Sequence, residues 1–241
     1  MLNENQPIVL ESIPPENLPV PWTFRDTWIG FAIFIVFMVG ISLLPLILPD
    51  EGWIDSVWLL IYQPLQFIPI WFLLRLRRAT WADIGLRKAQ PNVMAIGCGL
   101  IVLLLGVNLV NNLVMLALGV EVQAEQFSGL LASLDQPAIF LITGILFAPL
   151  FEEAIFRGFL FGGLRQKLGW VKAAFISSAI FAVGHLSIAA LIPTFALGFL
   201  FSYLYQKSNS IWPGIILHTL VNSVSLCALL DILQSGLPID F

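Results

Sequence analysis

The stretch that decides the fold is Phe-Glu-Glu-Ala-Ile-Phe-Arg-Gly, at residues 151–158. It places two adjacent carboxylates and a guanidinium inside an apolar run that extends from residue 137 to residue 161. A charged side chain at the centre of a membrane helix costs about 2.5–3.5 kcal/mol even on a lenient insertion scale, so it needs a partner or a function. On a helix, Glu153 and Arg157 lie four residues apart on one face, whereas Glu152 points about 100° away. We therefore expect a supporting ion pair between Glu153 and Arg157, and a free, reactive carboxylate at Glu152.

The composition is that of a membrane protein with several spans. The chain has 241 residues, of which 59% are hydrophobic and 11% are charged, and its mean hydropathy is +0.92. Soluble domains carry about 25% charged residues. The net charge of −4 and the lack of a Lys/Arg cluster exclude nucleic acid as a partner. Cys98 and Cys227 lie in separate apolar runs, and they indicate neither a disulfide framework nor a metal pair.

The apolar runs predict an all-α, polytopic membrane bundle of about seven transmembrane helices, since a bilayer core needs about 20 residues per span. The second run contains Pro64 and Pro69, which are expected to kink it. Almost nothing separates the fifth run from the sixth, so these two should form a tight hairpin. The predicted spans cover about residues 27–48, 56–74, 93–118, 137–164, 173–186, 188–205 and 211–230.

These spans divide the chain into four parts. We expect a flexible cytoplasmic tail over residues 1–26, three peripheral transmembrane helices over 27–136, a four-helix catalytic core over 137–231 and a short C-terminal tail over 232–241. With the N-terminus in the cytoplasm, every Lys and Arg except Arg157 falls on the cytoplasmic side, and the opposite loops carry acidic residues only. Because Lys and Arg in short loops set orientation, the N-terminus is predicted to be cytoplasmic.

Four polar side chains on three separate spans could meet in one cavity. The two histidines, His185 and His218, lie in apolar runs, and Asn222 shares a helix face with His218. Counted along the helices at about 1.5 Å per residue, these residues and Glu152 all lie in the inner half of the membrane. A carboxylate and an imidazole can deprotonate a water, while a second imidazole and an amide stabilise an oxyanion. This combination suits hydrolysis of a peptide bond without a protein nucleophile.

The same residues leave a second mechanism open. Glu152, His185 and His218 form a ligand set that could hold a divalent metal such as zinc, which would activate the water directly. The sequence does not separate the two mechanisms.

Three motifs on successive helices resemble those of a known family. They are Glu-Glu-x-x-x-Arg at 152–157, Phe-x-x-x-His at 181–185 and His-x-x-x-Asn at 218–222. Together they are similar to the motifs of the CPBP family, which contains the CAAX prenyl proteases and bacteriocin-processing enzymes and is also called Abi. The resemblance covers about residues 137–230. It implies an intramembrane endopeptidase of the plasma membrane of a bacterium, acting on membrane-associated, prenylated or leader-type peptides.

The resemblance also implies roles for individual residues. Glu152 is the general base, His185 helps to bind and activate the water, and His218 and Asn222 stabilise the oxyanion. Glu153 and Arg157 form a supporting ion pair. Both a metalloprotease and a metal-free glutamate mechanism have been proposed for the family. The expected partners are a peptide or protein substrate, with or without a lipid anchor, and the lipid bilayer.

Two other functions fit part of the pattern. A non-enzymatic membrane scaffold or bacteriocin-immunity protein would keep the motif residues for packing, and would tolerate Glu152→Gln. A proton-coupled transporter could use Glu and His as a relay, but seven spans without an evident repeat fit this function least. Three asparagines at residues 108, 111 and 112 are expected mainly to form hydrogen bonds between helices, with a cavity-lining role as the alternative.

Overall fold

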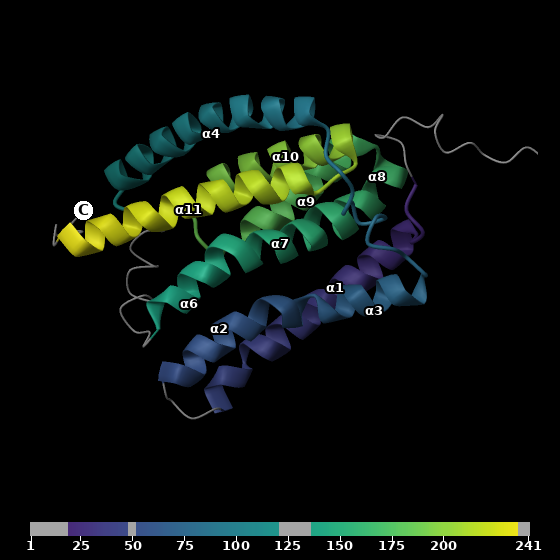
Figure 1. Cartoon of the computed structure of the whole chain (residues 1–241), viewed down its shortest axis with the longest axis horizontal. Coiled ribbons are helices and arrows are strands. Elements are labelled where there is room, and N and C mark those ends of the chain that lie inside the picture. Colours follow the sequence, from purple (N-terminus) through teal and green to yellow (C-terminus); the bar gives the residue numbers. More distant parts are fainter. Residues whose placement is uncertain (1–18, 48–51, 121–135, 236–241) are drawn as a thin grey trace, which may run out of the picture.

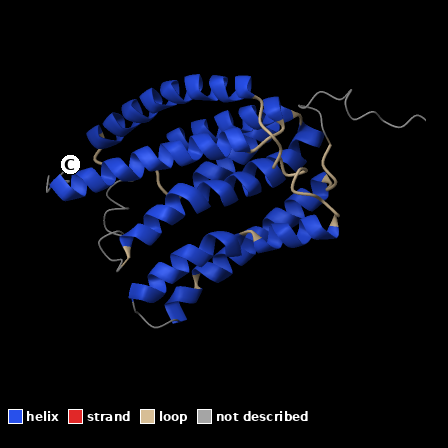
Figure 2. Cartoon of the chain, in the orientation of Figure 1, coloured by secondary structure: helices blue, strands red, loops and turns tan. Residues whose placement is uncertain are grey.

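The computed structural model describes residues 19–47, 52–120 and 136–235, and within these ranges the chain forms helices and no strands (Figure 2). The prediction of an all-helical polytopic bundle is therefore confirmed. Residues 121–135, between the third and fourth predicted spans, lie outside the described residues, as do most of the N-terminal tail and most of the C-terminal tail.

The first half of the chain forms an outer layer and a separate long helix. Thr23 and Asp26 form a capping box at the start of α1, in which each side chain bonds the other residue's backbone N–H. A break at Phe67 separates α2 from α3, between the two prolines that were expected to kink this span. The helices are α1 (Phe24–Ser42), η3 (Leu44–Ile47), α2 (Gly52–Gln66), α3 (Ile68–Leu76) and α4 (Pro91–Ala117).

The second half begins with one continuous helical rod that carries the two adjacent glutamates. Its segments are α6 (Pro137–Ile142), η4 (Thr143–Phe147), α7 (Ala148–Glu153), η5 (Ala154–Phe161) and α8 (Gly162–Leu168). In η4 and η5 the turns are of the π type, in which each N–H bonds five residues back; such turns occur frequently at functional sites. The rod is followed by α9 (Trp170–Gly184), α10 (Leu191–Ser208) and α11 (Trp212–Ser235).

All seven predicted spans correspond to helices, and within the described residues four helices are long and apolar enough to cross a membrane by themselves. Only 17–33% of the apolar window of each is buried, so most of its side chains face outward, as lipid-facing side chains do. Trp170–Gly184 and Trp212–Cys227 are apolar but shorter. The four long spans are Phe24–Ile47, Val57–Leu76, Pro91–Ala117 and Ala138–Leu168.

The helices pack in layers on either side of the rod (Figure 1). On one side α1 packs against α3, α8 and η5, and α2 packs against α6. On the other side α11 packs against α7 and η4, α9 and α10 form a hairpin, and α4 packs against α10 and α11. The rod therefore contacts both layers, and a residue on it can be either enclosed or directed toward the space under α4.

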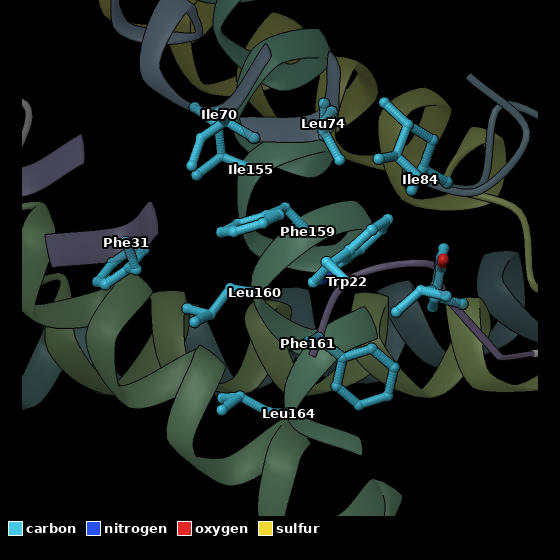
Figure 3. Packing of buried hydrophobic residues seen from close by; sticks show 14 of the residues in the cluster. Trp22, Phe31, Ile70, Leu74, Ile84, Ile155, Phe159, Leu160, Phe161 and Leu164 are labelled. Atoms are coloured by element: carbon cyan, nitrogen blue, oxygen red, sulfur yellow. The ribbon is translucent and has the colours of Figure 1, made fainter. Parts of the chain in front are cut away.

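The core of the molecule surrounds η5 and the start of α8. Figure 3 shows Trp22 and Phe159 among the packed apolar side chains, and their rings stack at 5.6 Å between centroids. Val20 and Trp22, assigned to the tail by sequence, thus belong to the core, and Asp26 pairs with Arg77. A Cβ at Gly158 would lie 2.6 Å from the carbonyl oxygen of Ile84, which lies in the loop between α3 and α4. Glycine at this position therefore lets that loop approach the rod closely.

Candidate active site

A cavity of about 770 Å³ lies among α2, α4, the rod, α10 and α11. Its lining includes all four residues to which the sequence assigned catalytic roles: Glu152, His185, His218 and Asn222. They come from the rod, the end of α9 and α11, which are distant in sequence. Much of the remaining lining is apolar, including side chains of α4 such as Leu104, Leu105 and Leu109. The cavity therefore combines a few polar groups with a mainly hydrophobic wall, as ligand sites usually do.

Glu153 lies behind the cavity wall in a closed network. Its Oε1 accepts a hydrogen bond from Nη1 of Arg157 at 2.9 Å, and Nδ1 of His218 lies 3.2 Å from the same oxygen. The side chains of Glu153 and Arg157 are 0% and 1% exposed. Because an ionised carboxylate only accepts, Nδ1 of His218 carries the hydrogen of this bond. Glu153 thereby fixes the orientation of the imidazole ring and directs Nε2 away from itself.

Glu152 faces the opposite way, toward the cavity. Its Oε2 lies 3.8 Å from Nε2 of His218, and its side chain is 21% exposed. A separation of 3.8 Å is too long for a direct hydrogen bond and suits two groups that share a water. His218 thus lies between the buried carboxylate of Glu153 and the cavity-facing carboxylate of Glu152.

Two phenylalanine rings enclose the charged network. The guanidinium carbon of Arg157 lies 4.3 Å from the ring centroid of Phe181 and 5.3 Å from that of Phe201. The same two rings contact the His218 ring, at centroid distances of 6.0 and 5.4 Å. Nε and Nη2 of Arg157 are buried without a hydrogen-bond partner, so the aromatic faces supply part of its stabilisation. The aromatic residue of the second motif thus contacts both Arg157 and His218.

Two glycines make room for this network, and sequence reasoning missed both. A Cβ at Gly214 would lie 2.7 Å from Oε2 of Glu153, and a Cβ at Gly198 would lie 2.9 Å from Nη2 of Arg157. Neither glycine carries a sequence signal of its role, because each depends on contact between helices far apart in the chain. The nearest hint is the position of Gly214, four residues before His218.

His185 lies outside the helix to which the sequence assigned it. The fifth span was expected to continue to residue 186, but α9 ends at Gly184, and His185 begins the turn toward α10. Leu186 adopts a left-handed backbone conformation with φ of 51°, which ends the helical path. Nδ1 of His185 lies 2.9 Å from the carbonyl oxygen of Phe181 and donates to it, so Nε2 is left for the cavity.

Asn222 joins α11 to the rod at the cavity wall. Its Nδ2 donates a hydrogen bond of 2.8 Å to the carbonyl oxygen of Gly144, which lies in the π-type turn η4. A carboxamide nitrogen carries two hydrogens, so the second remains for a group in the cavity. The hydrogen bond fixes the position of that donor.

The fit of a metal ion can be tested on the donor atoms. Among the described residues, no three His, Cys, Asp or Glu side chains are gathered closely enough to hold a metal. The metal-assisted mechanism that the sequence left open therefore stays a prediction, in which Glu152, His185 and His218 would supply the ligands.

Comparison with known proteins gives a match to one family model and to two relatives. Residues 134–224 match the model of a family described as type II CAAX prenyl endopeptidase Rce1-like. A Bacillus subtilis protein provisionally named a membrane peptidase, YdiL, is 31% identical over 105 residues, which cover 44% of this chain and 43% of the relative. UPF0177 protein YxdF of Lactococcus lactis is 39% identical over 83 residues, covering 34% of this chain and 44% of the relative.

The match covers less than half of the length of each relative. No solved structure matches the chain significantly. The matched segment contains the rod, α9, α10 and the part of α11 that carries His218 and Asn222, whereas α1 to α4 lie outside it.

Proposed function

We propose that the chain is an intramembrane endopeptidase of the CPBP family that hydrolyses peptide bonds by a Glu/His-activated water, because residues 134–224 match the type II CAAX prenyl endopeptidase model and one relative is provisionally named a membrane peptidase. Its substrates are membrane-associated peptides, of which prenylated and leader-type peptides are the two classes that the family suggests. The mainly apolar wall of the cavity supports a substrate with hydrophobic side chains.

One observation carries the mechanism. His218 contacts two carboxylates through its two ring nitrogens, with Glu153 on the enclosed side and Glu152 on the cavity side. An imidazole whose second nitrogen is held by a carboxylate has a fixed tautomer and orientation. Glu152 therefore faces a ring nitrogen of known direction, across a gap that suits one water or one substrate oxygen.

The proposed mechanism requires a hydrogen on each ring nitrogen of His218. Glu153 and Arg157 form a neutral pair, and Glu152 adds one negative charge. An imidazolium at His218 brings the sum to zero, which matters where the surroundings are apolar. In that state Nδ1–H donates to Glu153 and Nε2–H is directed toward the space in front of Glu152. This leaves Glu152 as the ionised base and His218 as a donor to an oxyanion.

The reaction then follows in two steps. Glu152 takes a proton from the water, whose oxygen forms a bond to the carbonyl carbon of the substrate. The carbonyl oxygen becomes an oxyanion that accepts hydrogen bonds from Nε2–H of His218 and from the second Nδ2 hydrogen of Asn222. Glu152 next donates its proton to the amide nitrogen, the C–N bond breaks, and an acid and an amine leave. We assign His185, through its free Nε2, to holding the water.

The test compares the wild type with an isosteric variant of the base. The purified protein is incubated with a peptide library made from a digested bacterial membrane fraction, supplemented with farnesylated and leader-type peptides, and new N-termini are counted by mass spectrometry. General base catalysis contributes about 10²–10⁴-fold, so Glu152→Gln should lower the rate of cleavage at least 100-fold.

A matched control makes the same chemical change elsewhere. Asp83 lies in the loop before α4, where its Oδ2 accepts a 2.7 Å hydrogen bond from the backbone N–H of Thr80. Asp83→Asn should cleave as the wild type does. Equal cleavage by the wild type and Glu152→Gln would overturn the proposal, and would favour the non-enzymatic scaffold.

A further inference from the structure

The three asparagines of α4 have two different environments. Asn111 is buried and donates a 2.7 Å hydrogen bond through Nδ2 to the carbonyl oxygen of Ala189, in the turn between α9 and α10. It thereby attaches α4 to the helical hairpin, as expected for a polar residue between membrane helices. Asn108 and Asn112 instead line the cavity that contains Glu152 and His218.

Asn108 and Asn112 have no hydrogen-bond partner within residues 19–47, 52–120 and 136–235. A carboxamide without a partner is unfavourable at membrane depth, where water is scarce. The rest of the α4 lining is hydrophobic, with Leu104, Leu105 and Leu109 next to the two amides. The two side chains are therefore available to a polar partner that enters the cavity.

The spacing of the two amides matches an extended peptide. Residues four apart on a helix lie on one face, about 6 Å apart along the axis. In an extended chain, alternate residues present their main-chain N–H and C=O groups on the same edge about every 6.6–6.8 Å. Each carboxamide offers both a donor and an acceptor, which complement these groups.

We propose that Asn108 and Asn112 are substrate-positioning residues that hold the main chain of an extended peptide across the cavity, so that its scissile carbonyl faces Glu152. The inference rests on the proposed endopeptidase function and adds the site that recognises the peptide backbone. It lies on α4, outside the segment 134–224 that the family model matches. The neighbouring leucines contact the apolar side chains of the substrate.

The experiment uses the best-cleaved peptide from the library described above. Asn108→Leu and Asn112→Leu should each raise KM about 5- to 10-fold, the usual worth of one hydrogen bond, with a smaller change in kcat. The same peptide is then synthesised with single N-methyl groups along its backbone. N-methylation should slow cleavage by the wild type at two backbone positions that are two residues apart. In the Asn108→Leu or Asn112→Leu variant that lacks the hydrogen bond to one of these positions, methylation of that position should cause no further loss of rate.

Asn111→Leu is the matched control. It should lower the melting temperature and leave the pattern of N-methyl effects unchanged. Asn112→Gln, which keeps the carboxamide, should restore part of the affinity that Asn112→Leu loses.

The outcomes separate this inference from the proposed function. If the wild type cleaves the library no better than Glu152→Gln, the endopeptidase function fails, and this inference with it. If the wild type cleaves but the leucine variants keep its KM and its N-methyl pattern, only the backbone-recognition site is refuted. An equal fall in kcat for every peptide, without coupling to N-methylation, would indicate amides that hold water and would also refute it.

Discussion

The two sides of the rod differ in how tightly they enclose the adjacent glutamates. Glu153 faces a packed region, where Arg157, His218 and the rings of Phe181 and Phe201 exclude solvent from its carboxylate. Glu152 faces a cavity of about 770 Å³, and its side chain remains 21% exposed. A rotation of about 100° between neighbouring residues on a helix is enough to separate a structural carboxylate from one that can react. The packed side fixes the geometry, and the open side admits the substrate.

The largest effect on the packed side should come from removing its cation. Arg157→Met leaves the buried Glu153 without its charged partner, and breaking a buried ion pair costs about 3–5 kcal/mol. The free energy of unfolding in detergent, measured by denaturant titration, should fall by this amount. Arg75→Met removes an exposed guanidinium that lies over Trp71, and should change stability by less than about 1 kcal/mol. Equal losses in the two variants would contradict the contrast between the two sides of the rod.

The next effect concerns the open side. Asn222→Ala removes a proposed oxyanion donor, and loss of one such donor lowers kcat about 10²–10³-fold. Steady-state cleavage of the peptide identified above measures this change. Ser223→Ala is the neighbouring control, because the Ser223 hydroxyl bonds the carbonyl of Thr219 within its own helix at 2.7 Å. A kcat for Asn222→Ala within a few-fold of the control would remove Asn222 from the mechanism.

A smaller effect should follow from crowding the network. Gly214→Ala would place a methyl group 2.7 Å from Oε2 of Glu153, and such overpacking costs about 1–3 kcal/mol. The displaced carboxylate should also lose its hold on His218, so the melting temperature and the rate of cleavage should fall together. Gly106→Ala is the control, since a Cβ there meets nothing within 4 Å. If the Gly214→Ala protein is as stable and active as the Gly106→Ala protein, the network can accommodate a methyl group at residue 214, which would contradict this prediction.

The smallest effect should distinguish the asparagines of α4. Asn111→Leu loses one hydrogen bond between helices, worth about 0.6 kcal/mol in membrane proteins. Asn108→Leu loses no bond within the described chain, so its free energy of unfolding should not fall. Thermal unfolding of the two variants side by side checks this difference. A larger loss in Asn108→Leu would place that side chain in the packing of the helices.

The helices themselves could be predicted because apolar runs and their polar ends are local features of the sequence. The break at Phe67 followed from Pro64 and Pro69. The exact end of α9 before His185 did not, because residues 185–190 are apolar apart from His185 and Ser187 and do not mark which residue ends the helix. The left-handed conformation of Leu186 depends on the surrounding packing.

The site was only partly predictable for the same reason. The four-residue spacing indicates that Glu153 pairs with Arg157 and that Glu152 is left free, since both facts depend on one helix. The bond between Glu153 and His218 joins residues 65 positions apart, and no local pattern predicts it. The different environments of Asn108, Asn111 and Asn112 likewise depend on which face of α4 lines the cavity.

The most direct measurement of the central claim compares Glu152→Gln with Glu153→Gln in one preparation, by rate of peptide cleavage and by melting temperature. Both changes replace a carboxylate by an isosteric amide at adjacent positions. Glu152→Gln should lose at least 100-fold in cleavage rate and keep the melting temperature of the wild type. Glu153→Gln should lower the melting temperature markedly, because it leaves Arg157 buried without a countercharge. Retained cleavage in Glu152→Gln, or an unchanged melting temperature in Glu153→Gln, would contradict the division between a reactive and a structural glutamate.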